Sequence, residues 1–195
     1  MPGTTEKVKE RYGLVTLKFA PITAEPDGAH PTYDAFIDLG SAVKAYVTAQ
    51  KAEGSIYGDD VLQLKVSEFS GADIQTETLL SDLEIESKLM GSVYNEDGTL
   101  TDSVNDSPKP GALAWIQKLK TKTGTIFRGV FMYFATPSLP DDQSDTKGDG
   151  VTFSNNAINF SATADKSGSW RIRKDCPSQS DAETWLESIR TGGNA

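Results

Sequence analysis

The chain has little of the chemistry that metal sites and disulfides need, with one cysteine and one histidine among its 195 residues. A lone Cys176 excludes a disulfide within the chain, and Cys176 with His30 supplies too few ligands for a usual zinc site. No apolar run approaches the roughly 20 residues of a membrane-spanning helix. The first residues, MPGTTEKVKERYG, lack the apolar stretch of a signal peptide, so we expect synthesis in the cytoplasm.

Short catalytic motifs are also missing. The chain has no GxxxxGK(S/T) phosphate loop, no GxGxxG after a strand and no GxSxG nucleophile turn. Spacing alone leaves a Cys176–His30 nucleophile pair open, because such pairs meet only in the fold, but no surrounding signature supports it. We therefore expect no enzyme activity, no cofactor and no metal site.

The acidic stretch DDQSDTKGDG, residues 141–150, has the composition of a calcium loop. If Asp149 and Gly150 took positions 5 and 6 of an EF-hand loop, Lys147 would stand at position 3 and Asn156 at position 12. A cation at position 3 repels the metal, and the bidentate Glu of position 12 is missing. The stretch is therefore interpreted as a polar connector between strands.

Basic charge is scarce and unevenly placed. The net charge of −9 argues against tight binding of a nucleic-acid backbone, which needs Lys and Arg to displace counterions. Residues 53–106 carry a net charge of −11, residues 107–136 one of +5, residues 137–165 one of −4, and residues 166–174 one of +4. Two interpretations stay open: an unevenly charged solvated surface, or a head-to-tail contact in which one face meets a different face of the next copy.

Strand signals dominate the rest of the chain. In residues 61–69, Leu62, Leu64 and Val66 alternate with polar residues, which predicts a half-buried strand. Runs rich in β-branched and aromatic residues predict the other strands. The predicted strands are 12–20, 41–49, 61–69, 123–138, 151–164 and 169–175.

Two segments predict helices instead. In SDLEIESKLMG, Ser81 and Glu84 have the spacing of a capping box, and Gly91 stands where a helix C-terminal glycine is expected. Ser180 and Glu183 repeat the capping spacing in SDAETWLESIRTGG, before an apolar face. The fold class predicted is mainly β, with one flanking mid-chain helix and a short C-terminal helix. We expect one domain over residues 1–195, with flexible ends at 1–10 and 191–195.

Aromatic residues suggest one alternative function. Trp115, Tyr133, Phe153 and Trp170 would suit a sugar-binding face of a β-sandwich, although large aromatic side chains more often stabilise a core. A carbohydrate- or receptor-binding module on a virion or cell surface is therefore the alternative to a structural role.

The order and spacing of several stretches together resemble a known family. They are YGLVTLKFAPIT (12–23), the strand pair 31–60 ending in Tyr-Gly-Asp-Asp, ETLLSDLEIESKLMGSVYNEDGTL (77–100), RGVFMYFATPS (128–138), TKGDGVTFSNNAINFSATA (146–164) and ETWLESI (183–189). In this order the chain resembles the major tail proteins, or tail tube proteins, of long-tailed, non-contractile bacteriophages. The resemblance covers nearly the whole chain, and its motifs are positions in a β fold rather than a catalytic signature.

The resemblance implies a tail-tube-type β-sandwich or barrel that assembles into hexameric rings, which stack into a hollow tube for DNA ejection. It implies a place in the virion tail, after synthesis in the host cytoplasm. The implied partners are other copies of the chain, the tape measure, tail terminator and distal tail proteins, and DNA in transient, non-specific passage, with no membrane. An excess of carboxylates suits such a conduit, because a negative wall repels phosphates.

Several residues are candidates for self-assembly or for the wall of the lumen. We expect acids of 53–106 to face the lumen or the ring-to-ring contact, and the basic block 107–136 to meet acids of a neighbouring copy. The loops 25–34 and 51–60 are expected to order on stacking. The candidate residues are Tyr57, Asp59, Asp60, Lys118, Lys120, Lys122 and Arg128.

Overall fold

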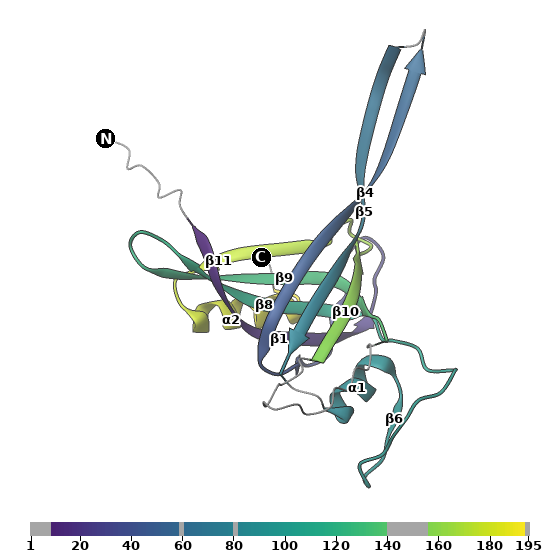
Figure 1. The fold of residues 1–195 in the computed structure, drawn as a ribbon, viewed down its shortest axis with the longest axis vertical. Helices are drawn as coiled ribbons and strands as arrows, with labels where there is room; N and C mark the ends of the chain where they lie inside the picture. The colour runs from purple at the N-terminus through teal and green to yellow at the C-terminus, as the bar shows by residue number, and fades with distance from the viewer. Residues whose placement is uncertain (1–8, 59–60, 80–81, 140–155, 194–195) are drawn as a thin grey trace, which may run out of the picture.

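The computed structural model describes residues 9–58, 61–79, 82–139 and 156–193 (Figure 1). The described chain is mainly β with one mid-chain and one C-terminal helix, which confirms the predicted fold class. Neither of these helices is long and apolar enough to cross a membrane. The predicted connector 141–150 lies outside the described residues.

The elements follow one another along the chain in this order: β1 Glu10–Ala24, β2 Thr32–Tyr33, β3 Ile37–Asp38, β4 Ala42–Gly58, β5 Val61–Thr78, α1 Leu83–Met90, β6 Val93–Tyr94, β7 Leu100–Thr101, β8 Gly111–Lys120, β9 Thr125–Pro137, β10 Asn156–Thr163, β11 Arg171–Cys176 and α2 Gln179–Arg190.

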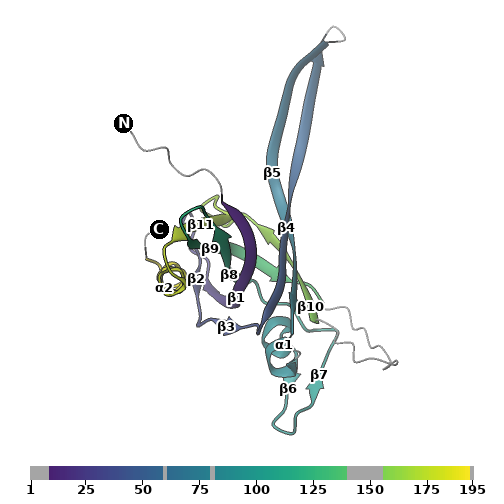
Figure 2. The same ribbon diagram turned by 60° about the vertical axis from the view of Figure 1, so that its left-hand side comes forward.

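One antiparallel sheet organises the fold. Its strands follow the order β2-β1-β8-β9-β10-β5-β4, with β3 paired to β1 and β11 paired to β9. The sheet curves until β4 comes into contact with β1 (Figures 1 and 2). Strands β6 and β7 form a separate hairpin beside α1. The curvature gives the sheet a concave face and a convex face, and each buries its own core.

The alternation of side chains along β8 separates the two cores. Leu113 and Trp115 join the core on the concave face, which includes Phe19 and is called the inner core. Ala114 and Ile116 join the core on the convex face beneath α2, which is called the outer core. Because both faces of β8 are buried, its sequence alternates in size more than in polarity. For that reason β8 was not predicted from the sequence. Its first six residues, 111–116, are all buried.

Helix α1 lies against the inner core through Leu89 and Met90. Its N-cap is Asp82, whose Oδ1 accepts a hydrogen bond from the Glu84 amide at 2.8 Å. The prediction of Ser81 as the cap is therefore wrong by one residue. Gly91 ends the helix with a φ of 81°, as predicted, because the left-handed conformation favours glycine.

Helix α2 covers the outer core. Its N-cap is Ser178, whose Oγ accepts a hydrogen bond from the Asp181 amide at 3.1 Å, so the helix begins before the predicted Ser180 cap. Trp185 and Leu186 are buried against the sheet. The indole of Trp185 packs over Gly129 of β9, where a Cβ would lie 2.6 Å from the ring. The absence of a side chain at Gly129 therefore lets α2 approach the sheet closely.

The described parts of the two predicted flexible ends are held in place. Lys9 Nζ lies 2.6 Å from Asp175 Oδ2, and Glu10 begins β1. At the other end the amides of Thr191 and Gly193 donate to the carbonyls of Glu187 and Ser188. These contacts join residues 9–10 to the sheet and residues 191–193 to α2.

Candidate functional site

A projecting arm, defined as residues 51–58 of β4 and 61–70 of β5, extends away from the body (Figures 1 and 2). Strand β10 pairs with β5 from Thr78 to Ala72 and no farther. The β4–β5 register shifts between the Gln50–Gly71 and Lys51–Phe69 pairs, where the arm begins. Beyond this shift β4 and β5 pair only with each other in the described structure.

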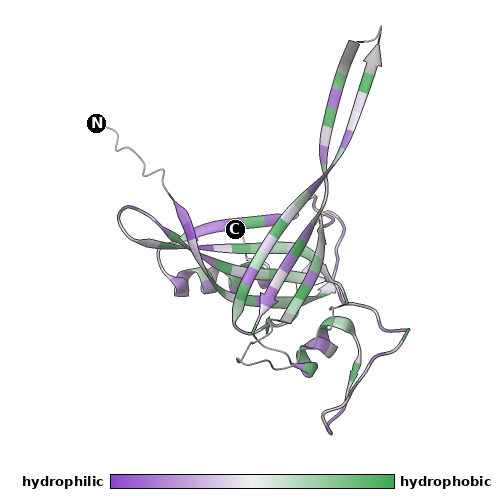
Figure 3. Ribbon diagram, viewed as in Figure 1, coloured by the Kyte–Doolittle hydropathy of each residue, from purple (hydrophilic) through white to green (hydrophobic). Residues whose placement is uncertain are grey.

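One face of the arm is apolar and uncovered. Ile56 pairs across the hairpin with Leu64, and Gly54 pairs with Val66, so the three apolar side chains share a face. Their exposed fractions are 61% for Ile56, 51% for Leu64 and 41% for Val66. Figure 3 shows hydrophobic bands alternating with hydrophilic ones along the arm. The predicted strand is confirmed. The prediction that its apolar face is buried is wrong, because no other strand of the described sheet extends beside this segment.

The base of the arm is fixed to the body by aromatic contacts. Phe69 stacks on Trp170, with ring centroids 4.4 Å apart and planes inclined by 20°. The Arg171 guanidinium lies 4.2 Å from the centroid of the Trp170 ring, within cation–π distance. These contacts link the arm to the start of β11.

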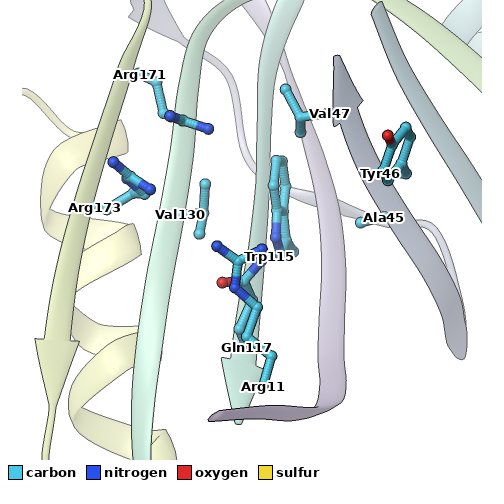
Figure 4. A pocket seen from close by; sticks show the side chains of 9 residues that line it. All are labelled: Arg11, Ala45, Tyr46, Val47, Trp115, Gln117, Val130, Arg171 and Arg173. Atoms are coloured by element: carbon cyan, nitrogen blue, oxygen red, sulfur yellow. The ribbon is translucent and has the colours of Figure 1, made fainter. Parts of the chain in front are cut away.

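An arginine pocket of about 230 Å³ lies between β11, β9, β8 and β4. Figure 4 shows Arg171 and Arg173 extending from β11 toward Val130, with Trp115 and Gln117 beyond. The residues that line it are Arg11, Ala45, Tyr46, Val47, Trp115, Gln117, Val130, Arg171 and Arg173.

The arginine pocket is positively charged and contains no carboxylate in its lining. Burial lowers the pKa of Arg171, and repulsion from Arg173 and Arg11 lowers it further. No ion pair joins any of these three arginines to a carboxylate of the residues described. The Trp115 indole nitrogen is buried and has no hydrogen-bond partner there either. The pocket thus holds cationic and donor groups that lack acceptors.

An acidic end, defined as residues 82–106, comprises α1, the β6–β7 hairpin and the following loop. It carries seven acidic side chains and the single basic side chain of Lys88. Several apolar side chains are also exposed here, with exposed fractions of 60% for Val93, 40% for Tyr94 and 101% for Val104. Figures 1 and 2 place α1 and β6 at the end of the molecule opposite the arm.

The structure does not bring the predicted assembly residues into one cluster. Tyr57 lies near the tip of β4, while its side chain, like Asp59 and Asp60, falls outside the described residues. Lys118 and Lys120 are on β8. Lys122 lies in the β8–β9 turn, and Arg128 lies on β9.

Arg128, one of the predicted assembly residues, is paired with a carboxylate of its own chain. Its Nε lies 2.5 Å from Asp175 Oδ1, and a second guanidinium nitrogen lies 3.0 Å from Oδ2. This bidentate pair raises the pKa of Arg128 through the hydrogen bond. Because Asp175 of the same chain neutralises Arg128, Arg128 does not serve as a free cation for a neighbour.

The arginine pocket was not predicted from the sequence, although part of its signal was present. Arg171 and Arg173 belong to the +4 block at 166–174, and their spacing of two places them on one face of β11. Arg11 lies at the far end of the sequence, opposite Leu119 of β8 in the sheet register. Only the pairing of β1, β8, β9 and β11 reveals that the three arginines converge.

His30, Asp165 and Ser167 have the residue types of a nucleophilic triad but a different connectivity. His30 Nδ1 contacts both Asp165 Oδ2 at 2.7 Å and Ser167 Oγ at 3.1 Å. In a triad the serine meets the other ring nitrogen. Ser167 Oγ also donates to Asp165 Oδ1 at 2.6 Å, and His30 stacks on Tyr133. These contacts join the loop 25–31 to the β10–β11 turn.

Further contacts hold loop 25–34 against the body. Loop 25–34 was expected to order on stacking, but in the single chain Lys166 also binds Asp27 at 2.9 Å, and Tyr33 donates to the Tyr133 carbonyl at 2.8 Å. These contacts hold loop 25–34 against the body within the single chain.

The possible Cys176–His30 pair gains no support. Burial raises the pKa of the Cys176 thiol, which disfavours the nucleophilic thiolate. His30 makes its contacts to Asp165 and Ser167 instead. Within the described residues, no group of three or more His, Cys, Asp or Glu side chains is placed to hold a metal ion.

The aromatic residues of the alternative function do not form an open platform. Trp115 and Tyr133 are buried, with exposed fractions of 1% and 5%. Trp170 contacts Phe69 and Arg171, and Phe153 lies outside the described residues. Their aromatic surface therefore serves mainly packing within this chain.

Comparison with known proteins assigns no family. No family model matches the chain, and no curated protein matches it.

Proposed function

We propose that this protein is a virion structural subunit that self-assembles into the tail tube of a long-tailed phage. In this proposal the subunits form hexameric rings, the rings stack, and DNA is ejected through the tube. The observation that carries the proposal is the arm, whose apolar face of Ile56, Leu64 and Val66 is exposed in the single chain. The described part of the chain provides no cover for that face.

Physical chemistry favours a protein partner for the arm. A two-stranded hairpin is only marginally stable by itself in water. Fully burying one Leu or Val side chain stabilises by roughly 1.5–3 kcal/mol, so covering three apolar side chains is a substantial driving force. A neighbouring copy supplies such cover at every repeat of an assembly.

The arrangement of the arm also suits repeated association. The arm leaves the body at one end of the molecule, and the acidic end lies at the other (Figures 1 and 2). Contacts between two different surfaces are heterologous, so they close into rings or continue as open stacks. Both geometries are needed for a tube made of rings.

The charge of the chain is compatible with a DNA conduit. A net charge of −9 disfavours adhesion of nucleic acid to the assembled wall. The proposed partners are other copies, then the tape measure, tail terminator and distal tail proteins at their places in a tail. The alternative, a carbohydrate- or receptor-binding module, has less support, because Trp115 and Tyr133 are buried and do not form an aromatic surface for a sugar.

The test is assembly of the purified chain. Sedimentation and negative-stain electron microscopy of the concentrated protein should give rings or tubes of constant diameter. Leu64→Ser combined with Val66→Ser should raise the concentration needed for assembly at least about tenfold, equivalent to ~1.4 kcal/mol. Circular dichroism and thermal melting should change little, because both side chains lie on the uncovered face of the arm and outside both cores.

Lys65→Ser is the matched control, since Lys65 lies between the two substituted residues on the other face of β5. Its assembly should stay close to that of the native chain. A native chain that stays monomeric at high concentration and is retained on a glycan array would contradict the tube proposal and support the binding module.

A further inference from the structure

We propose that the arginine pocket is a carboxylate-binding site that receives an acidic side chain from the acidic end of a second copy. The inference rests on the proposed function and deepens it by naming the two surfaces through which successive copies meet. It also replaces the expected role of the basic block 107–136 with that of Arg11, Arg171 and Arg173.

The two arginines outside the pocket each have a carboxylate partner within the described chain, whereas the three arginines of the pocket have none there. Arg128 is paired with Asp175, and Arg190 is paired with Glu187. Arg11, Arg171 and Arg173 instead line one pocket, and that lining has no carboxylate. The positive charges of the three arginines repel one another. A bound carboxylate would relieve this repulsion and accept several charge-assisted hydrogen bonds.

A carboxylate on a protein fits the site better than a free ion. Exposed Tyr46 lies at the edge of the pocket, so an incoming protein surface also finds an aromatic contact. The acidic end offers the complementary combination, with seven acidic side chains and exposed Val93, Tyr94 and Val104. Charge and apolar surface therefore match on the two sides.

The placement of these surfaces allows a continuous stack. Strand β11 and the start of β1, which carry the three arginines, lie on the side of the body away from α1 and β6 (Figures 1 and 2). Each copy therefore presents the pocket on one side and the acidic end on the other. Such a contact leaves one pocket and one acidic end free after every addition.

Charge reversal tests the pocket. Arg173→Glu should raise the concentration needed for assembly at least about tenfold, because it places a carboxylate where one must bind. Lys174→Glu is the matched control, with the same charge change on the next residue of β11 and no place in the pocket lining. Its assembly should stay within about twofold of the native chain. Equal effects of the two variants would overturn the proposal.

Photo-crosslinking identifies the occupant. Gln117 lines the pocket on the same face of β8 as Trp115, so p-benzoylphenylalanine in place of Gln117 brings the probe there while all three arginines remain (Figure 4). Mixing this variant with an ¹⁵N-labelled native chain distinguishes crosslinks between copies from those within one. Labelled peptides from residues 82–106 would support the proposal.

Other crosslinks would overturn it. A crosslink within one chain to residues 140–155 would mean that the chain's own acidic segment occupies the pocket. A labelled peptide from elsewhere, or crosslinked nucleic acid, would assign another occupant. Assembly of Arg173→Glu at the native concentration would overturn the pocket proposal but leave the tube subunit standing, whereas a native chain that never assembles would overturn both.

Discussion

Phe69 stacks on Trp170 at a centroid distance of 4.4 Å, and this contact sets where the arm leaves the body. Phe69→Ala should reduce the free energy of unfolding by at least about 1 kcal/mol, because an aromatic pair contributes about 0.5–1.5 kcal/mol beyond its buried area and the burial of the partly buried ring is lost as well. Backbone amides of residues 51–56 and 64–70 should exchange faster with deuterium, while those of β8 and β9 should not. Phe69→Tyr is the control that keeps the ring. Unchanged exchange in the arm of Phe69→Ala would show that the stack does not anchor it.

The pairing of Asp175 with Arg128 and Lys9 predicts a specific dependence of stability on pH. The hydrogen bond from Arg128, and then Lys9, hold the pKa of the Asp175 carboxyl at about 2, below its usual value of 3.8, although desolvation opposes them. A depressed folded-state pKa contributes stability above the unfolded-state pKa, and that stability is lost as the pH falls from about 4 to about 2.

Asp175→Asn should therefore lower the free energy of unfolding at pH 7 by about 1–2 kcal/mol. The difference from the native chain should shrink below about pH 4. Urea denaturation at pH 7, 5, 4 and 3 measures it. A difference that stays constant over this range would mean that Asp175 stabilises the fold by packing rather than by charge.

Gly129 predicts the sensitivity of the α2 contact. A Cβ at this position would lie 2.6 Å from the Trp185 ring, so Gly129→Ala should displace α2 and cost about 1–3 kcal/mol of stability. The emission of Trp185 should shift as its indole becomes exposed. Gly124→Ala is the control, because a Cβ at that position would have nothing within 4 Å, and its effect should stay within about 0.5 kcal/mol.

Combining Gly129→Ala with Trp185→Leu should cost less than the sum of the two single substitutions, since the smaller side chain relieves the clash. Additive losses in the double variant would contradict the proposed contact.

Tyr33 is predicted to stabilise the fold through its buried hydroxyl, which donates to the Tyr133 carbonyl at 2.8 Å. Tyr33→Phe should cost about 1–2 kcal/mol at pH 7, because that carbonyl loses its side-chain donor. Burial, and then the negative charge of Asp165, raise the pKa of Tyr33 above its usual value of 10.0.

The raised pKa determines the sign of the alkaline effect. Stability from a group with a raised folded-state pKa is present below the unfolded-state pKa and falls as the pH rises above about 10. The native chain should therefore lose stability in alkali faster than Tyr33→Phe does, as measured by urea denaturation between pH 8 and 11. Tyr94→Phe, at an exposed position, is the matched control.

Local sequence signals predicted much of the fold. Alternation and β-branched residues located most of the long strands, and Gly91 marked the end of α1 because a left-handed residue there needs no tertiary partner. The two N-caps were misplaced by one or two residues, since Asp82 and Ser178 compete with nearby serines for the same role. Strand β8 was missed because burial on both faces removes the polar alternation that identifies a strand.

A mainly β chain with two helices, and with charge arranged in blocks, follows from residues that lie close together along the chain, so local patterns were enough to predict it. The fold was needed to show that Asp175 neutralises Arg128, that Arg11 lines the same pocket as Arg171 and Arg173, and that the arm is left uncovered. Those outcomes depend on which strands pair and where the sheet ends. Strand pairing joins residues far apart in the sequence, so no local pattern records it.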